Sequence, residues 1–298
     1  MASLWQRHWV LGTMVSRLIV VNVLVWIAVV ALSVLGRWFI PALMPYSVHA
    51  FFLATTADPA VLVWRPWSVV THMFTHAGLF HIFFNMWLLW IIGNIFQGFF
   101  GQRKLLAIYL MGGLVGFLVF FLLYNGSPAL DMRGTTALGA SAAVMAIFVA
   151  TATYFPDMTL RLFLFGDVKL KYLALIYVLL DFFALNGVSN VGGHAGHLGG
   201  ALYGFLSMSL IRKGTDLNGW MERLIDFFAR LFTRGEKMRV AYRNREADKR
   251  RKSDEEFNVE KKARQERIDA ILDKISRNGY DSLTKDEKDY LFRHGQDI

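Results

Sequence analysis

The chain has 298 residues, of which 55% are hydrophobic and 15% aromatic, and its mean hydropathy is +0.37. This composition indicates a polytopic membrane protein rather than a pair of soluble domains. The formal net charge is +9, and most of the Lys and Arg residues follow residue 213. Cysteine is absent, which excludes disulfides, thiolate metal sites and a cysteine nucleophile. We therefore expect a membrane domain over residues 1–213 and a basic tail over residues 214–298.

Six apolar runs in the first part have about the length that a membrane-spanning helix needs. The first run is not followed by a small-residue cleavage site, so we expect a retained helix rather than a signal peptide. The fourth run is the shortest. The sequence therefore predicts an all-α membrane protein, a six-helix transmembrane bundle with a short fourth helix. The runs are about 18–35, 79–96, 105–124, 139–155, 170–188 and 193–211.

Basic residues beside these runs predict the orientation of the bundle. If the N-terminus is inside, most of them are also inside, among them Arg103, Lys169 and Arg212, whereas Arg37 and Arg133 are outside. This positive-inside bias places the start of the fourth run toward the outer face, at the same depth as the start of the sixth. The expected location is a bacterial inner (cytoplasmic) membrane, with both termini in the cytoplasm.

Two segments outside the runs have an interfacial character. The segment Trp38–Trp67 contains four prolines and many aromatic residues, so we expect it in the outer interface. In Leu217–Arg234, large apolar residues recur at helical spacing opposite a charged face. This pattern predicts an amphipathic helix on the inner membrane surface.

The basic tail begins as a charged segment and ends in a predicted helical hairpin. Arg239–Lys262 is expected to be a solvated linker or an exposed helix, in which Lys249–Lys252 could contact anionic lipid or a protein partner. Beyond it, an apolar helical pattern ends at Asn278-Gly279, and Thr284 with Glu287 forms a capping box for a second helix. Nucleic-acid binding is not expected.

A serine stands at the head of the fourth run, and a histidine lies near the start of the sixth. Ser141 and His197 each accompany a stripe of small residues at four-residue spacing, and such stripes allow two helices to pack closely. If the stripes face each other, His197 can reach the hydroxyl of Ser141 and act as its general base. The stripes are Ala142, Ala146 and Ala150, and Gly196, Gly200 and Gly204.

Two further polar residues lie on one face of the second run. His81 and Asn85 are four residues apart, and each offers a hydrogen-bond donor. Either residue alone is explained by a hydrogen bond between helices. Together with Ser141 and His197, they are donors suited to an oxyanion, as is the backbone N–H at a helix start. This combination favours acyl transfer.

These motifs, in this order, resemble the rhomboid family of intramembrane serine proteases over roughly Trp64 to Gly204. The resemblance implies that Ser141 attacks the scissile carbonyl and that His197 serves as base and then acid. Asn85, His81 and the Ser141 N–H would hold the oxyanion. The motifs are Trp64-Arg65, His81-Ile-Phe-Phe-Asn85, Gly139-Ala-Ser141-Ala and Gly196-His197-Leu-Gly-Gly-Ala-Leu-Tyr-Gly204.

The resemblance also implies substrates that are transmembrane segments of other membrane proteins, with no cofactor, no metal and no acidic third member. One departure is Ala142, where the family usually has Gly, and the added methyl group could tighten or misplace the oxyanion hole. His194 is a rival base. Only His197 is followed by Leu-Gly-Gly, so we expect His194 to support the site.

Three alternatives stay open. Asp181 within the fifth run could make a hydrogen bond between helices, or it could form a proton path with His194 or His197 in a transporter. The sequence shows no duplicated pattern of the kind that inverted repeats leave. A metal enzyme could use His72, His76 and His81, although no Glu stands in a His-Glu-x-x-His pattern. The third alternative is an inactive rhomboid-like binder of transmembrane helices.

Overall fold

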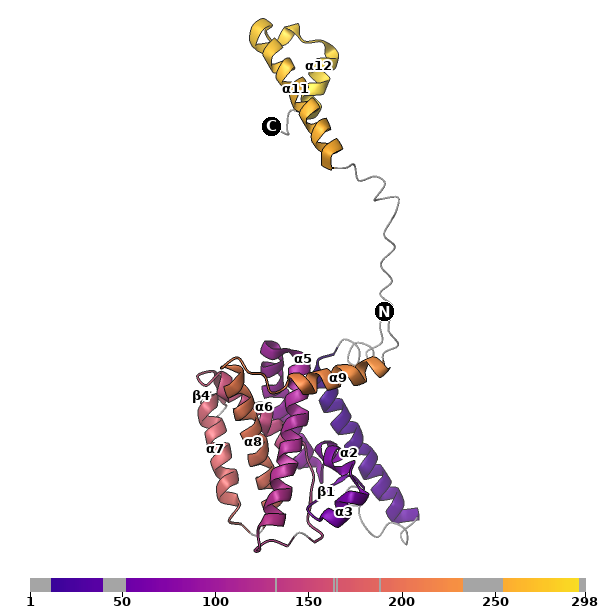
Figure 1. The fold of residues 1–298 in the computed structure, drawn as a ribbon, viewed down its shortest axis with the longest axis vertical. Helices are drawn as coiled ribbons and strands as arrows, with labels where there is room; N and C mark the ends of the chain where they lie inside the picture. Colours follow the sequence, from indigo (N-terminus) through magenta and orange to yellow (C-terminus); the bar gives the residue numbers. More distant parts are fainter. Residues whose placement is uncertain are drawn as a thin grey trace. The chain divides into compact units, whose positions relative to one another are not determined.

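The computed structural model describes residues 12–39, 52–131, 133–162, 164, 166–187, 189–232 and 254–294. The chain forms two compact units, residues 1–232 and residues 233–298. The first unit is a helical bundle and the second is a small helical hairpin (Figure 1). Pro41 and Pro45 of the predicted interfacial segment, and Lys249–Lys252 of the predicted linker, lie outside the described residues.

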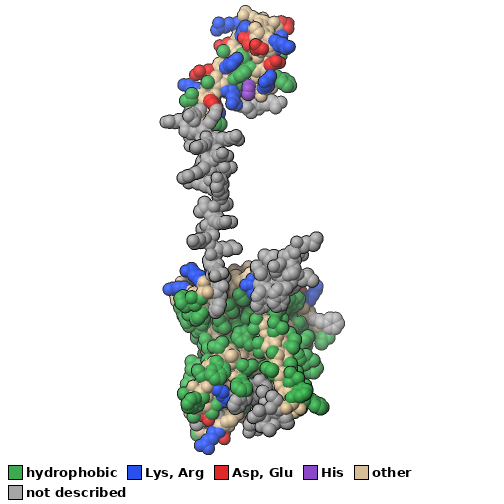
Figure 2. All heavy atoms as spheres, turned by 90° about the vertical axis from the view of Figure 1, so that its right-hand side faces the viewer, with side chains coloured by type: hydrophobic (Ala, Val, Ile, Leu, Met, Phe, Trp, Pro, Cys, Tyr) green, Lys and Arg blue, Asp and Glu red, His purple; other side chains and the backbone are tan. Residues whose placement is uncertain are grey.

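The first unit is an all-α membrane bundle, as predicted. Its helices are α2 (Met14–Phe39), α5 (Leu79–Gly126), α6 (Ser141–Tyr154), α7 (Leu170–Ala184) and α8 (Val191–Ile211). Among the described residues, α2 and α5 are long and apolar enough to cross a membrane, and α6 is a shorter apolar helix. Hydrophobic side chains cover most of the bundle face in Figure 2, as expected for a surface in contact with lipid.

The second and third predicted runs are joined in the single element α5. The helix changes direction at Gly101, whose φ of 81° and ψ of 170° are not helical. Glycine adopts this conformation without the steric penalty that a β-carbon would bring. The two halves of α5 therefore connect without an intervening loop.

Helix α6 is the centre of the bundle. Every residue from Ala142 to Ala152 is buried, because α5 packs on one side of α6 and α8 on another. Small residues allow this close approach, since a β-carbon at Gly112 of α5 would overlap the methyl group of Ala146. The head of α6, with Ser141, is thus held between the two neighbouring helices.

Helix α7 is much less enclosed than α6. Its buried residues are Leu170, Ala174 and Asp181. Large apolar side chains such as Leu180 and Phe183 are 64% and 69% exposed, which suits contact with lipid. Asp181, in the C-terminal half of α7, is turned inward toward α8.

Short elements that the all-α prediction did not include connect the helices. Strand β1 (Thr55–Thr56) pairs antiparallel with β2 (Thr136–Ala137), and β3 (Thr159–Leu162) pairs with β4 (Gly166–Lys169). The β1–β2 pair ties the predicted interfacial segment to the loop that precedes Ser141. Between β1 and α5 lie α3 (Pro59–Trp64), α4 (Ser68–Thr71) and the 3-10 helix η2 (His72–Phe74).

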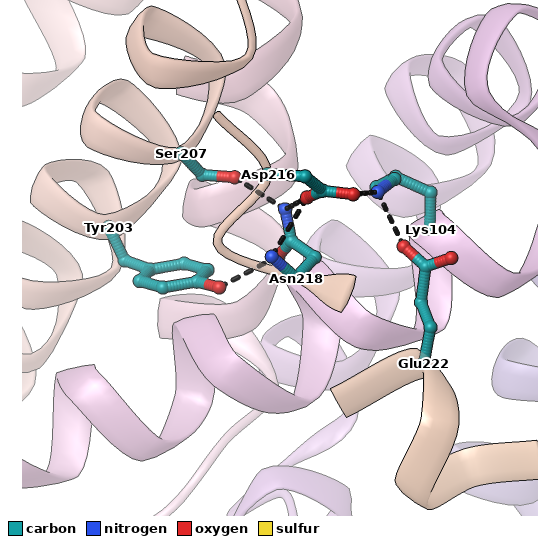
Figure 3. A network of polar contacts seen from close by, with 6 residues as sticks. All are labelled: Lys104, Tyr203, Ser207, Asp216, Asn218 and Glu222. Atoms are coloured by element: carbon teal, nitrogen blue, oxygen red, sulfur yellow. Dashed lines mark hydrogen bonds and ion pairs between the residues drawn. The ribbon is translucent and has the colours of Figure 1, made fainter. Parts of the chain in front are cut away.

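The predicted amphipathic helix is α9 (Gly219–Phe232), and it lies across one end of the bundle (Figure 1). Lys104 of α5 forms ion pairs with Asp216, just before α9, and with Glu222 in it (Figure 3). These contacts explain why the first unit extends to Phe232, whereas the sequence grouped this helix with the tail after residue 213. Its place on the membrane surface stays a prediction.

A buried amide completes this junction. Asn218 is fully buried, donates to Ser207 Oγ over 2.7 Å and accepts from Tyr203 Oη over 2.7 Å (Figure 3). Burial opposes ionisation of the Asp216 carboxyl, but the hydrogen bonds from Lys104 and Asn218 and the positive charge of Lys104 together outweigh it, so the pKa of Asp216 lies below its usual value. The end of α8 is therefore fixed to the start of α9 by polar contacts.

The second unit contains α11 (Asp254–Asn278), the 3-10 helix η3 (Tyr280–Ser282) and α12 (Lys285–His294). The backbone of Thr284 donates to Glu287 Oε2 over 2.8 Å, and the backbone of Glu287 donates to Thr284 Oγ1 over 3.4 Å. These two bonds form the predicted capping box. Lys274 of α11 also lies 2.9 Å from Glu287 Oε2, so the same carboxylate joins the two helices.

Candidate active site

A cavity of about 350 Å³ brings together four residues that the sequence singled out. His81 and Asn85 enter it from α5, Ser141 from α6 and His197 from α8. These residues are far apart in sequence and meet because α6 is packed between α5 and α8. The rest of the lining is mostly apolar and comprises Phe80, Phe84, Leu88, Leu138, Val144, Met145, Tyr177, Asn190 and Gly193.

Ser141 is the first residue of α6, and the chain before it is fixed by two main-chain hydrogen bonds. Gly139 N–H donates to the carbonyl oxygen of His72 over 2.9 Å, and Ala140 N–H donates to His76 Nε2 over 3.4 Å. The first N–H groups of a helix have no partner within the helix and carry partial positive charge. The Ser141 N–H is therefore suited to receive a developing oxyanion beside its own hydroxyl.

His81 and Asn85 lie in the first two turns of α5. A β-carbon at Gly139 would be 2.8 Å from His81 Nε2, so the imidazole rests directly on the backbone that precedes Ser141. Asn85 Nδ2 donates to the carbonyl oxygen of His81 over 2.8 Å. An amide nitrogen carries two hydrogens, and Asn85 lines the cavity, so the second hydrogen can be donated to a bound group.

His197 lies in the second turn of α8 and contacts an acidic residue of α7. Its Nδ1 is 2.9 Å from Asp181 Oδ1, and His194 Nδ1 is 2.7 Å from the same oxygen. The side chain of Asp181 is 5% exposed, against 15% for His197 and 25% for His194. The expectation that no acidic side chain accompanies the Ser–His pair is therefore wrong.

The glycine stripe of α8 meets two neighbours. A β-carbon at Gly200 or Gly204 would overlap the carbonyl oxygens of Ala142 and Ala146, so these two glycines lie against α6 as predicted. Gly196 differs from the prediction, because the atom nearest to a β-carbon placed there would be the carbonyl oxygen of Gly116 in α5, at 3.7 Å. Two of the three glycines therefore set the spacing between α6 and α8.

Ala142, the departure from the usual family motif, is accommodated by α5. The methyl group of Ala142 faces Gly116, where a β-carbon would overlap it at 2.5 Å. Ala142 is absent from the residues that line the main cavity. The additional methyl group is thus placed against a residue without a side chain. Ala142 nevertheless lines a second, smaller cavity together with Ser141 and His197.

The three histidines proposed for a metal enzyme do not form a ligand group, although the rings of His76 and His81 are 5.0 Å apart. His72 Nδ1 lies 3.0 Å from the carbonyl oxygen of Ser68, and His76 Nε2 accepts from Ala140 N–H. Within the described ranges, the group with metal-ligand spacing is a different one, in which ligand atoms of Asp181, His194 and His197 lie within 4.8 Å of one another. Zn²⁺ accepts such ligands, but the direct hydrogen bonds already account for this arrangement.

The bundle and the tail each match a known protein family. Residues 63–213 match the Rhomboid domain, and residues 252–297 match DUF6576, a family of unknown function. The chain is 30% identical over 177 residues to presenilin-associated rhomboid-like protein A, mitochondrial, of Danio rerio, covering 57% of this chain and 43% of the relative.

Two other relatives align over similar lengths. RHOMBOID-like protein 12, mitochondrial, of Arabidopsis thaliana is 34% identical over 159 residues, covering 49% of this chain and 47% of the relative. Rhomboid-like protease 2 of Toxoplasma gondii is 27% identical over 161 residues, covering 53% and 52%. The chain thus spans about half the length of these curated relatives. The names of the first two contradict the expected location in a bacterial cytoplasmic membrane.

Proposed function

Because the chain belongs to the rhomboid family, we propose that it is an intramembrane serine endopeptidase that cleaves transmembrane segments of other membrane proteins. The observation that carries this proposal is the cavity shared by Ser141, His197, His81 and Asn85. It unites a hydroxyl, an imidazole and two side-chain donors next to a helix start. These are the groups that acyl transfer requires.

In the proposed reaction, Ser141 Oγ attacks the scissile carbonyl carbon while His197 accepts the hydroxyl proton. The oxyanion that forms is stabilised by the Ser141 N–H and by the side chains of Asn85 and His81. His197 then gives the proton to the leaving amine, and an acyl-enzyme remains on Ser141. Water, deprotonated by His197, hydrolyses this ester and regenerates the serine.

The apolar walls of the cavity support a hydrophobic substrate. The lining includes Phe80, Phe84 and Leu88 of α5 and Val144 and Met145 of α6. A transmembrane segment unwound at the cleavage site would therefore contact mainly apolar side chains. We propose transmembrane-helix proteins and the lipid bilayer as partners of the bundle. For the tail, we propose contact with anionic lipid or a protein through its basic residues.

The test is labelling of the purified protein with a serine-directed fluorophosphonate, together with cleavage of a model transmembrane substrate. Ser141→Ala should abolish both signals without changing the melting temperature in detergent. Ser209→Ala is a suitable control, because Ser209 is on α8 but does not line the cavity, and it should behave as the unchanged protein. Cleavage that persists in the reconstituted Ser141→Ala variant would contradict the proposal.

The same experiment separates the alternatives. An inactive binder of transmembrane helices would associate with the substrate but would neither react with the fluorophosphonate nor cleave. A proton-coupled transporter would depend on Asp181 and not on the Ser141 hydroxyl. Labelling of Ser141 that blocks cleavage is the result that excludes both.

A further inference from the structure

We propose that Asp181 is a positioning residue for His197, and that His194 in turn holds Asp181. This inference rests on the proposed protease function. It adds an acidic member to the Ser–His pair, supplied by α7, and assigns a role to a charged group that the reaction above does not use.

The contact between Asp181 and His197 selects one tautomer of the imidazole. An ionised carboxylate only accepts hydrogen bonds, so a separation of 2.9 Å between Asp181 Oδ1 and His197 Nδ1 requires the proton to be on Nδ1. The other nitrogen, Nε2, then has a free lone pair and is the one that can accept a proton. Since His197 lines the cavity with Ser141, this is the tautomer that a general base needs.

The burial of Asp181 argues that the carboxylate serves the imidazoles. A charge on a side chain only 5% exposed is costly unless it is paired and hydrogen-bonded. In the described part of the chain, Asp181 Oδ1 is bonded to His194 and His197, and Oδ2 has no hydrogen-bond partner. When His197 takes the serine proton, the resulting imidazolium is therefore next to a buried negative charge that stabilises it.

His194 has the secondary role. It lies three residues before His197 on α8, and its Nδ1 is 2.7 Å from the same oxygen of Asp181. It does not line the cavity, so it has no access to the reacting atoms there. His194 and His197, on successive turns of α8, both contact Asp181 Oδ1. The second contact keeps the carboxylate in position beside His197.

The kinetic test compares Asp181→Asn, Asp181→Glu and His194→Gln with the unchanged protein. Asparagine keeps the shape but can present its NH₂ group to His197 Nδ1 and favour the wrong tautomer. We expect Asp181→Asn to lower kcat by at least about tenfold, with KM within about twofold and an unchanged melting temperature. Asp181→Glu should recover part of kcat, and His194→Gln should lose less than Asp181→Asn.

Other outcomes would overturn the inference. An unchanged kcat in Asp181→Asn, with Ser141→Ala inactive, would refute the positioning role and leave the protease function standing. Loss of kcat only in proportion to a fall in melting temperature would show a purely structural role. Activity that is lost with EDTA and restored by Zn²⁺ would identify the three residues as metal ligands instead.

A second measurement does not depend on the Asp181 variants. In the unchanged protein, ¹⁵N chemical shifts of selectively labelled histidine, assigned with His197→Gln, report the tautomer of His197. The inference requires the Nδ1–H form at neutral pH. The Nε2–H form would overturn it even if the Asp181 variants failed to fold.

Discussion

Gly200 of α8 lies directly on the main-chain carbonyl of Ala142 in α6, so closely that a β-carbon at Gly200 would overlap that oxygen. Ala142 follows Ser141, and Gly200 is three residues after His197. The spacing between nucleophile and base is therefore set by a contact in which one partner has no side chain.

Replacing Gly200 with valine should force α8 away from α6. Overpacking a close contact costs about 1–3 kcal/mol, and a backbone carbonyl cannot rotate away, so we expect the upper end of this range. Melting temperature in detergent and turnover should both fall. The control is Gly98→Val, since Gly98 is an exposed helical residue of α5 with nothing within 4 Å of a β-carbon. Normal melting and turnover in Gly200→Val would show that this contact does not hold the site.

Gly139→Ala should damage the site more than the fold. Gly139 has φ of +125°, a conformation that L residues rarely adopt, and its β-carbon would be 2.8 Å from His81 Nε2. Gly134→Ala is the matched control, because Gly134 has φ of +71° but nothing within 4 Å of a β-carbon. Both variants should lose about 1–2 kcal/mol through backbone strain.

The difference between these two variants appears in activity. Only Gly139→Ala displaces His81, so it should lose turnover beyond what its melting temperature explains, whereas Gly134→Ala should retain it. Equal turnover in the two variants, measured at equal folded concentration, would argue against a role for His81 beside the nucleophile.

The tail hairpin should lose stability in acid. The hydrogen bond from Lys274, followed by that from the Thr284 backbone, lowers the pKa of Glu287 from 4.5 to about 2. Because the folded pKa lies below the unfolded one, this contribution is fully present above pH 4.5 and is lost as the pH falls toward 2. Circular dichroism of residues 252–298 during thermal unfolding should show a falling midpoint in this window. Glu287→Gln should flatten that part of the profile, and an unchanged slope would contradict the assignment.

Removal of the second unit should leave the proposed catalysis intact. A chain that ends at Gly235 retains α9 and its contacts with Lys104, so the whole first unit is preserved. Turnover of one substrate should stay within about twofold, whereas a tenfold loss (about 1.4 kcal/mol in the barrier) would show that the tail acts on the site. A chain that ends at Gly214 is the informative contrast, because it also removes Asn218, the partner of Tyr203 and Ser207, and should melt at a lower temperature.

The sequence was sufficient to predict the long helices of the bundle, because an apolar run long enough to cross a membrane leaves little choice of structure. The hairpin of the tail was equally readable, since Thr284 and Glu287 form a local motif. The β1–β2 pair was not predicted. Its two-residue strands are too short to show an alternation of apolar and polar residues, and the pairing joins Thr55 to Ala137, which are far apart in the sequence.

The candidate site was predicted in part, because four of its residues belong to local sequence motifs. Ser141, His197, His81 and Asn85 stand in motifs with recognisable order, and the structure gathers them in one cavity. Asp181 was noticed as a charge in an apolar run, and His194 or His197 was named as a possible partner in a proton path. The contact with both depends on how α7 is rotated against α8, which the sequence does not show. The role of His76 as acceptor for the Ala140 N–H had no signal in the sequence at all.

The sparse burial of α7 has a consequence for how a substrate reaches the cavity. Leu170 and Ala174 anchor one end of this helix, and the remaining buried residue, Asp181, anchors the other. A transmembrane segment that pushed the outer end of α7 sideways would therefore separate Asp181 from His197. A substrate that enters between α7 and α8 would break the hydrogen bond by which Asp181 aligns His197. Cleavage by that route therefore requires α7 to close again before the serine reacts.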